Sequence, residues 1–458
     1  MLYITFLIIA RVAELVDALD FMATAVETLS NLERRITVKV PVEPLQKEMS
    51  SRFQRLTRTA KVPGFRPGKA PLKMIEQQYG PQIKEEVFAE AIETSFGQAI
   101  QENKLRVAGM PNIQHKPLNQ VHDDFEYTAT FEVFPEVTLA DFKAASIEKP
   151  VAQITDKDVN KTIDVLLKQR AQFIETKEAA AKGDRLTLTL TSFINDKQVE
   201  TTGDKPIQII LGDDSRFAMF DDHLVGGKEG ESKTFEVNYP ETHNPKELAG
   251  KKVQYNVNFI LIAKPKLPEV NAQFAQSLGV ADGNVDKMRE EIKQSLEQEL
   301  NKRVNIKLKE QVFTQLIDSC KADLPKALIN VEINRMAQST YANLKQRGAD
   351  LKQFKLEPSM FEEQAKKTCK LRLILAEIVD KNNLRATPDQ IKAMVNEFAL
   401  NFDDTDEAVK WFYAEPSRLE EPTALATETN VVDWFMKQCK VQDKKTTFDE
   451  LMTGSAKT

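Results

Sequence analysis

The sequence predicts a multidomain α+β protein, and three observations support that prediction. Its 458 residues exceed what one hydrophobic core normally organises, which indicates two to four domains. Alternating apolar patterns typical of strands occur in two separate regions, whereas the C-terminal region repeats apolar residues at the spacing of helices. Glycine is scarce, at 16 residues, which favours much helix and few tight turns.

The first 21 residues stand apart from the rest of the chain. Residues 2–10 are apolar but too few to span a bilayer. They lack the preceding basic residues and the small-residue cleavage site of a signal peptide. Residues 10–19 resemble the conceptual translation of a bacterial leucine tRNA gene, so we expect residues 1–21 to be a mis-assigned start or a disordered extension, with the natural start at Met22. A genuine targeting segment is the alternative, and the intact mass of the native protein would decide between the two.

Residues 22–135 are predicted to form a small α+β domain. Residues 35–40 alternate in polarity, as in a half-buried strand. Residues 45–60 carry one apolar stripe and therefore indicate an amphipathic helix. Further helices are expected over residues 72–79 and 83–102, and a further strand over 125–133.

The remainder divides into three predicted parts. Residues 136–180 are expected to be a mostly helical linker that packs on the C-terminal domain. Residues 181–266 alternate in polarity between glycine-marked turns, which predicts a β-rich domain. Residues 267–458 are predicted to be all-α, because amphipathic stripes recur throughout them.

Composition limits the classes of function. The formal net charge of −6 argues against a general nucleic-acid binder, so an anionic partner must be met by a local basic patch. The three cysteines are far apart and form no CxxC pair, which indicates reduced thiols. The four histidines show no metal-binding spacing, and the chain has no Gly-rich phosphate loop, so we expect neither a metal nor another cofactor.

Such a basic patch occurs between residues 47 and 73, around an exposed loop. Glu48 is the one acidic residue there, against eight basic ones. The basic residues are Lys47, Arg52, Arg55, Arg58, Lys61, Arg66, Lys69 and Lys73. A solvated helix face would explain the charge alone. However, two glycines and two prolines fix an exposed turn, and Phe65 has no local apolar partner within it. An exposed ring between cations suits docking to a surface of protein and RNA phosphate.

The loop resembles the ribosome-binding signature GFRxGKxP of trigger factors, and it matches that signature at every fixed position. The matching segment is Gly64-Phe65-Arg66-Pro67-Gly68-Lys69-Ala70-Pro71. Residues 74–80 and 446–452 also resemble the family, and the order of parts agrees from Met22 onward. The resemblance implies an α+β ribosome-binding head, an FKBP-like β-rich middle domain and an all-α C-terminal chaperone domain. It implies ribosome binding by Gly64, Phe65, Arg66, Gly68, Lys69 and Pro71.

The same resemblance implies the partners. The loop would dock on a protein of the large ribosomal subunit beside the exit tunnel, with help from rRNA. The helical domain would enclose nascent polypeptides without ATP, in a cytoplasmic protein with no membrane partner that serves folding and export. A homodimer away from the ribosome is a further expectation. Adaptable apolar surface for clients could come from Met288, Met336, Met360, Met394 and Phe398.

The middle domain resembles an FKBP-type prolyl isomerase. Such an enzyme needs no nucleophile or metal, because an apolar pocket can desolvate the amide and favour its twisted form, lowering a barrier of roughly 18–20 kcal/mol. The resemblance places the pocket at Leu190, Val199, Glu200, Ile207, Phe217, Phe220, His243 and Tyr255. Some of these are expected to be ordinary core residues.

This chain departs from the usual FKBP pattern at several pocket positions. The family usually has aromatic residues where Leu190, Val199 and Ile207 stand, Ile-Pro-Gly-Phe at residues 217–220, and a tyrosine near His243. Because the pocket is poorer in rings, we expect weak isomerase activity or none, with the domain retained as a binding surface for apolar-aromatic peptide.

Two other functions fit parts of the sequence. A periplasmic chaperone with an inserted isomerase domain would explain the apolar start but not the basic docking loop. A dedicated prolyl isomerase would explain the middle domain but not its thinned pocket. Association with polysomes separates the three possibilities.

Overall fold

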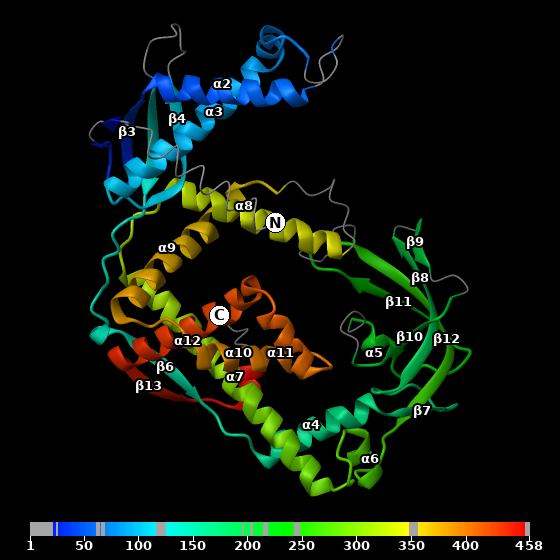
Figure 1. Ribbon diagram of the computed structural model, residues 1–458. Helices are drawn as coiled ribbons and strands as arrows, with labels where there is room; N and C mark the ends of the chain where they lie inside the picture. The colour runs from blue at the N-terminus through cyan, green and yellow to red at the C-terminus, as the bar shows by residue number, and fades with distance from the viewer. Residues whose placement is uncertain are drawn as a thin grey trace. The chain divides into compact units, whose positions relative to one another are not determined.

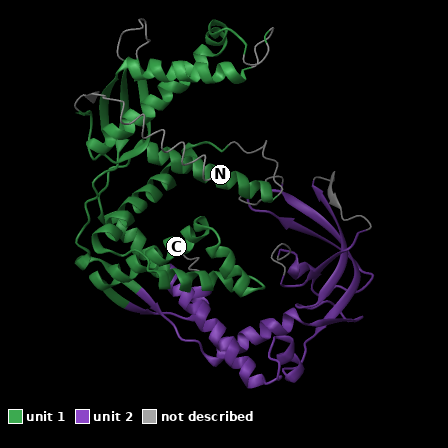
Figure 2. Ribbon diagram, viewed as in Figure 1, with its two compact units in different colours: residues 1–148, 307–442 green, residues 149–306, 443–458 purple. Residues whose placement is uncertain are grey.

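The computed structural model shows a chain of helical and mixed domains (Figure 1). It describes residues 22–23, 26–60, 65, 69–115, 125–194, 197–201, 205–213, 219–241, 248–347 and 356–453. Contacts divide the chain into two compact units (Figure 2). The first unit comprises residues 1–148 and 307–442, and the second comprises residues 149–306 and 443–458. The expectation for residues 1–21 lies outside the described residues.

The first unit begins with an antiparallel sheet, which forms the head. Its strands are β1 (Met22–Ala23), β2 (Glu27–Thr28), β3 (Glu33–Val40), β4 (Val107–His115) and β5 (Phe125–Val133), in the order β1-β3-β5-β4 with β2 also on β3. Ile36 lies opposite Ala129, and Val38 lies opposite Tyr127. All four side chains are buried, so the alternation read from the sequence places one face of β3 and β5 in the core.

Two helices complete the head, α2 (Val42–Thr59) and α3 (Leu72–Glu102). Leu45 of α2 and Val87 of α3 belong to the same core cluster as the buried face of the sheet. The sequence pattern predicted two helices where α3 is continuous through Pro81. Ile75 before Pro81 and Ile83 after it are both buried, so packing on both sides outweighs the local cost of proline.

The rest of the first unit is mainly helical. Its helices are the end of α7 (Val285–Ser319), α8 (Lys326–Gln346), α9 (Ser359–Asn382), α10 (Pro388–Ala399), α11 (Thr405–Tyr413), η3 (Pro416–Leu419) and α12 (Glu420–Gln438). Thr387 and Gln390 form a capping box at the start of α10, and Asp404 caps α11. Phe142 of η1 (Phe142–Ala144) packs against Phe435 of α12, with ring centroids 4.9 Å apart.

The head contacts α8 directly. The Glu132 carboxylate accepts hydrogen bonds from the backbone N–H groups of Lys326 at 3.1 Å and Ala327 at 2.7 Å, which caps the helix. Gly109 has a φ of +91° and packs so closely that a Cβ there would lie 2.4 Å from the Cβ of Ala327. A glycine is therefore required where β4 meets α8.

The second unit contains the β-rich middle domain. Its strands are β7 (Gln172–Glu175), β8 (Arg185–Ile194), β9 (Lys197–Thr201), β10 (Ile207–Ile210), β11 (Ser232–Asn238) and β12 (Lys252–Lys266). They form one sheet in the order β10-β8-β12-β11, with β7 on β12 and β9 on β8. The short helix α5 (Asp221–Leu224) contributes the buried Leu224 to the core of this domain.

The segment between the head and the middle domain differs from expectation. Residues 136–180 were expected to be mostly helical, but they hold one α-helix, α4 (Asp156–Gln169), besides η1 and the strands β6 (Ser146–Val151) and β7. β6 and β7 are extended because they pair with strands distant in sequence, β13 and β12, and such pairing cannot be read from the local sequence. α4 packs on α6 (Ala272–Ser277) and the start of α7.

The C-terminal region is mainly helical, as predicted, and it also contains one strand that was not predicted. Residues 440–445 form strand β13 (Lys440–Lys445), which pairs with β6, before the short helix α13 (Phe448–Met452). All six residues of β13 are exposed, so backbone pairing rather than a buried stripe defines the strand. The sequence pattern therefore had no apolar alternation to reveal it.

Candidate functional sites

The described ends of the basic loop are anchored by a small apolar cluster. Ala60 follows α2, and Ala70 precedes α3. Both are buried against Ile75, with Phe53 and Tyr79 packed beside them. This cluster fixes the distance across which the loop must close.

The described loop residues present their side chains to solvent. Phe65 is 41% exposed, and Lys69 and Pro71 are also exposed. Gly64, Arg66 and Gly68 lie outside the described residues. Phe65 and Lys69 are therefore both accessible to a partner, and their role in docking stays a prediction.

The positive charge of α2 is partly neutralised within the head. Arg52 pairs with Glu48, Glu86 and Glu90, and Arg55 also pairs with Glu48. The sequence count missed Glu86 and Glu90 because they come from α3. Among described residues, the cations of this stretch that form no ion pair are Lys47, Arg58, Lys69 and Lys73. Arg58, Lys69 and Lys73 lie at or next to the loop, whereas Lys47 lies near the start of α2.

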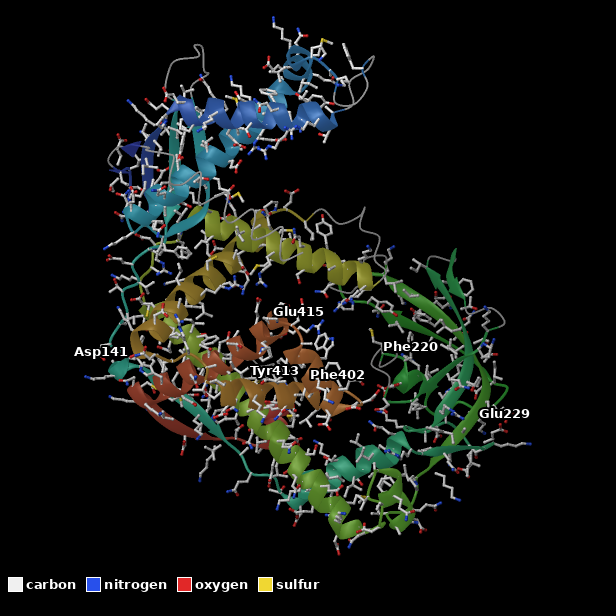
Figure 3. All side chains as sticks on the ribbon, in the orientation of Figure 1. Asp141, Phe220, Glu229, Phe402, Tyr413 and Glu415 are labelled. Atoms are coloured by element: carbon white, nitrogen blue, oxygen red, sulfur yellow. The ribbon has the colours of Figure 1, made fainter. Side chains whose placement is uncertain are left out.

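A cluster of aromatic rings forms the second candidate site, in the middle domain. Phe220 lies edge-on to Tyr255, with centroids 4.7 Å apart, and edge-on to Phe235 at 5.6 Å. All three rings are buried. Figure 3 labels Phe220 beside α5. The Tyr255 hydroxyl is 2.8 Å from the Tyr239 hydroxyl, so the ring cluster carries a hydrogen-bonded polar pair.

The structure places the predicted pocket residues unevenly. Phe220 and Tyr255 are in contact, and Leu190 is buried in the same cluster, against which Ile207 packs. Val199 and Glu200 are placed as backbone of β9. Phe217 and His243 lie outside the described residues. Leu190 and Ile207 are therefore aliphatic members of a core that also holds the rings.

Sequence reasoning missed three rings of this region, Phe235, Tyr239 and His223. The His223 imidazole stacks on Phe235 at 4.6 Å with an interplanar angle of 5°. Phe235 and Val237 alternate with exposed residues along β11, and that alternation was the available signal. Phe235, Tyr239 and His223 therefore add aromatic side chains to a domain that lacks them at Leu190, Val199 and Ile207.

An exposed aromatic surface occurs where α10 and α11 meet, and we call it the aromatic tip. It consists of Leu400, Phe402, Trp411 and Tyr413, which are between 48% and 74% exposed. Phe402 and Trp411 both contact the ring of Phe412, and the Arg418 guanidinium lies over Trp411 at 4.1 Å. Figure 3 labels Phe402, Tyr413 and the nearby Glu415. Exposed carboxylates occur close by in the sequence, at Asp403, Asp404, Asp406, Glu407 and Glu415.

The methionines that were expected to offer client surface divide between core and surface. Met288 is 1% exposed and packs with α4 and α6, so it is a core residue. Met360 is 69% exposed, whereas Met336, Met394 and Phe398 are partly buried. Helical spacing alone could not distinguish these positions.

Within the described residues, no group of histidine, cysteine and carboxylate side chains is arranged to hold a metal ion. Among the same residues, no helix combines the length and apolar character needed to cross a bilayer.

Comparison with known proteins decides the family. Residues 22–166 match the model for bacterial trigger factor protein, and residues 284–437 match the model for the trigger factor C-terminus. A trigger factor from Methylobacillus flagellatus is 52% identical over 434 residues, which are 95% of this chain and 100% of the relative. The chain belongs to the bacterial trigger factor family. The trigger factor of Nitrosospira multiformis is 43% identical over 95% of this chain and 100% of its own length.

Two further matches concern the middle domain and the solved structures. Residues 176–261 match the model for FKBP-type peptidyl-prolyl cis-trans isomerase, so this trigger factor family member carries a prolyl isomerase domain. A solved trigger factor chaperone aligns over 91% of this chain and all of its own, at 16% identity and a TM-score of 0.45. The sequence matches confirm the resemblance and the FKBP-like middle domain.

Proposed function

We propose that this protein is an ATP-independent chaperone that binds the large ribosomal subunit near the exit tunnel and receives nascent polypeptides there. The anchored docking loop supports this proposal. Phe65 and Lys69 are both exposed in the loop, and Ala60 and Ala70 at its two ends are buried. Such a loop combines an apolar contact for ribosomal protein with a cation for rRNA phosphate.

Co-sedimentation of the purified full-length protein with ribosomes tests the docking. Replacing Phe65, Arg66 and Lys69 with alanine should abolish co-sedimentation at physiological salt, with the folded state unchanged by circular dichroism. Trp411→Ala combined with Lys345→Ala removes a ring and a cation elsewhere and should bind normally. Unchanged co-sedimentation of the triple variant would refute this role of the loop.

We further propose that the aromatic tip binds unfolded clients. Its four large apolar side chains are all exposed, and exposed carboxylates are close to them in the sequence, which favours capture of apolar segments while limiting self-association. Phe402→Ser with Trp411→Ser should weaken suppression of the aggregation of a denatured client. Equal suppression by this variant and the parent protein would count against the tip.

The isomerase domain is proposed to act weakly on prolyl peptides and mainly to bind them. Leu190 and Ile207 stand where the family usually has aromatic side chains, whereas Phe220, Phe235 and Tyr255 keep an apolar wall of rings. A peptide isomerisation assay on the whole protein should give less turnover than a ring-rich FKBP enzyme. Comparable turnover would show that the aliphatic positions do not limit catalysis.

The proposed setting is the cytoplasm, because that is where ribosomes and nascent chains occur together. A homodimer away from the ribosome is part of the same proposal. Sedimentation equilibrium across a range of protein concentrations tests it, and a single monomeric species throughout would exclude it.

A further inference from the structure

A lysine of the middle domain, Lys233, lies on the face of β11 that otherwise carries buried apolar side chains. Phe235 and Val237 of this strand are buried, and Lys233 shares their face because side chains two residues apart lie on the same side of a strand. Thr234 and Glu236 are exposed on the other face. The Lys233 side chain is half-buried. An ammonium group in this position needs polar partners, because its loss of water is costly.

Backbone carbonyl groups at the end of α5 are those partners. The Lys233 Nζ donates to the carbonyl oxygen of His223 at 3.3 Å and to that of Val225 at 3.0 Å. It also lies 5.8 Å from the ring centre of Phe259, within the range of a cation–π contact. Val225 is the residue at which α5 ends, so the ammonium group caps the C-terminal end of this helix.

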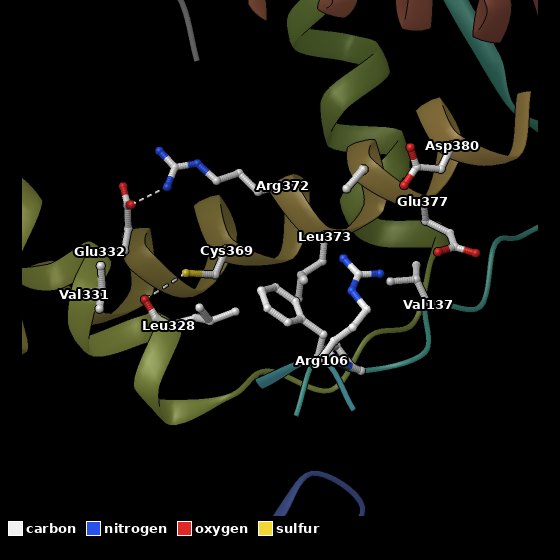
Figure 4. Close-up of a pocket in the computed structure, with 13 residues that line it drawn as sticks. Arg106, Val137, Leu328, Val331, Glu332, Cys369, Arg372, Leu373, Glu377 and Asp380 are labelled. Atoms are coloured by element: carbon white, nitrogen blue, oxygen red, sulfur yellow. Dashed lines mark hydrogen bonds and ion pairs between the residues drawn. The ribbon is translucent and has the colours of Figure 1, made fainter. Parts of the chain in front are cut away.

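Lys233 forms no ion pair with any residue that the structure describes. A buried charge more commonly pairs with an opposite one, and Glu332 of α8 is an example. Its carboxylate pairs with Arg335 at 2.5 Å and with Arg372 of α9 at 2.6 Å, and Figure 4 shows the pair with Arg372. The ammonium group of Lys233 is instead directed to the backbone of α5.

The helix α5 contacts β11 at a second point. The His223 imidazole stacks on the Phe235 ring, as described above. Lys233 and Phe235, two residues apart on one face of β11, therefore hold the same helix, one by hydrogen bonds and the other by ring stacking. α5 has four residues, and a single helical turn is unstable by itself, so its position depends on such contacts.

The position of α5 sets the position of the Phe220 ring. Phe220 directly precedes α5, and its carbonyl oxygen accepts hydrogen bonds from the N–H groups of His223 at 2.9 Å and Leu224 at 3.0 Å. The Phe220 ring packs on Tyr255 and Phe235 in the ring cluster. A displacement of α5 would therefore move this ring within the cluster.

We propose that Lys233 is a positioning residue of the prolyl isomerase domain, which fixes the end of α5 and thereby keeps the Phe220 ring oriented for a bound prolyl peptide. Lys233 acts through Phe220 and needs no contact with the peptide. A ring that is already held in place contacts the twisted amide without further ordering, and this preorganisation favours the transition state. The inference rests on the proposed role of the ring cluster as the peptide site.

Isomerisation and binding of a Phe-Pro peptide by the full-length protein test the proposal. Lys233→Met keeps a long apolar side chain but loses the ammonium donors. The kcat should fall about tenfold while KM changes less than about twofold, because a misoriented ring still buries the peptide but no longer fits the transition state. Lys233→Arg keeps a cationic donor and should retain at least about a third of the parent kcat.

Lys252→Met is the matched control. Lys252 is an exposed cation at the start of the neighbouring strand β12, where it pairs with Glu236. This variant removes an ammonium group from the same sheet without touching α5, so its kcat and KM should equal those of the parent protein. Urea unfolding of every variant confirms that the assays compare folded proteins.

A double-mutant cycle with Phe220→Leu tests whether Lys233 acts through the Phe220 ring. Once leucine replaces that ring, Lys233→Met should have little further effect on kcat, because the group that it positions is gone. Lys233→Met and Lys233→Arg decide the proposal even if Phe220→Leu fails to fold.

Several outcomes overturn the proposal. An unchanged kcat in Lys233→Met, an equal loss in Lys233→Arg, or additive effects in the cycle would each show that Lys233 does not position the ring, while the turnover of the parent protein leaves the isomerase function standing. If the parent binds the peptide without turnover, the positioning role fails because there is no rate to control. If the parent neither binds nor isomerises the peptide, the proposed peptide site fails as well.

Discussion

The docking loop and the isomerase ring cluster both depend on aromatic side chains, but they hold them in opposite ways. Phe65 is exposed on a loop whose ends alone are buried. Phe220, Phe235 and Tyr255 are buried against one another and form part of a domain core. We expect that the Phe65 ring can be changed without affecting the fold. In the proposed isomerase pocket the same rings would serve both peptide binding and stability, so both quantities must be measured for any substitution there.

The largest expected effect is that of Phe220→Ala. Removal of a buried ring from the cluster should lower the free energy of unfolding of the middle domain by about 3–5 kcal/mol. Urea unfolding of the full-length protein, followed by a probe on the middle domain, measures this loss. A change below about 1 kcal/mol would mean that Phe220 is a pocket residue and not a core residue.

A second test uses two glycines, Gly227 in the middle domain and Gly97 in α3 of the head. A Cβ at Gly227 would lie 2.3 Å from the Phe259 ring, so Gly227→Ala should destabilise the middle domain by about 1–3 kcal/mol. A Cβ at Gly97 in α3 would meet no atom within 4 Å, so Gly97→Ala should stabilise the head by up to about 1 kcal/mol. Calorimetry of both variants gives the signs, and equal signs would contradict the packing described for them.

The hydroxyl pair of the ring cluster should have a smaller effect. Tyr255→Phe and Tyr239→Phe should each cost about 1 kcal/mol, because each removes one side of a partly buried hydrogen bond. The double variant should cost less than the sum of the two, since the bond is lost only once. Strict additivity in a double-mutant cycle would show that the two hydroxyls act independently.

The smallest effect on stability is expected at the docking loop. Phe65→Ala should change the free energy of unfolding by no more than about 0.5 kcal/mol, because the ring is exposed. It should nevertheless weaken ribosome binding. Chemical unfolding and ribosome co-sedimentation of the same sample measure both quantities, and a large loss of stability would place Phe65 in the core.

The features that could be predicted from the sequence are those formed by residues close together in the chain. The strands β3 and β5, the helix α2 and the loop signature were predictable, because each is defined by residues that are close in the chain. The ion pairs of Arg52 with α3 were not, because Glu86 and Glu90 are distant in sequence. The contacts of Phe235 with Phe220 and Tyr255 were also unpredictable, because they depend on the pairing of β11 with β12. The strand β13 had no apolar pattern to mark it.

Pro81 weakens α3 between the base of the docking loop and the part of the helix that packs on the sheet. Proline has no N–H to donate to the carbonyl four residues earlier, so α3 lacks one hydrogen bond between its first two turns and the part that packs on the sheet. Ile75, which holds the base of the loop, lies before this weak point, and Ile83 lies after it. We therefore expect the first turns of α3, which carry the base of the loop, to bend more easily than the part that packs on the sheet. Amide hydrogen exchange should accordingly be faster over residues 72–80 than over residues 83–102.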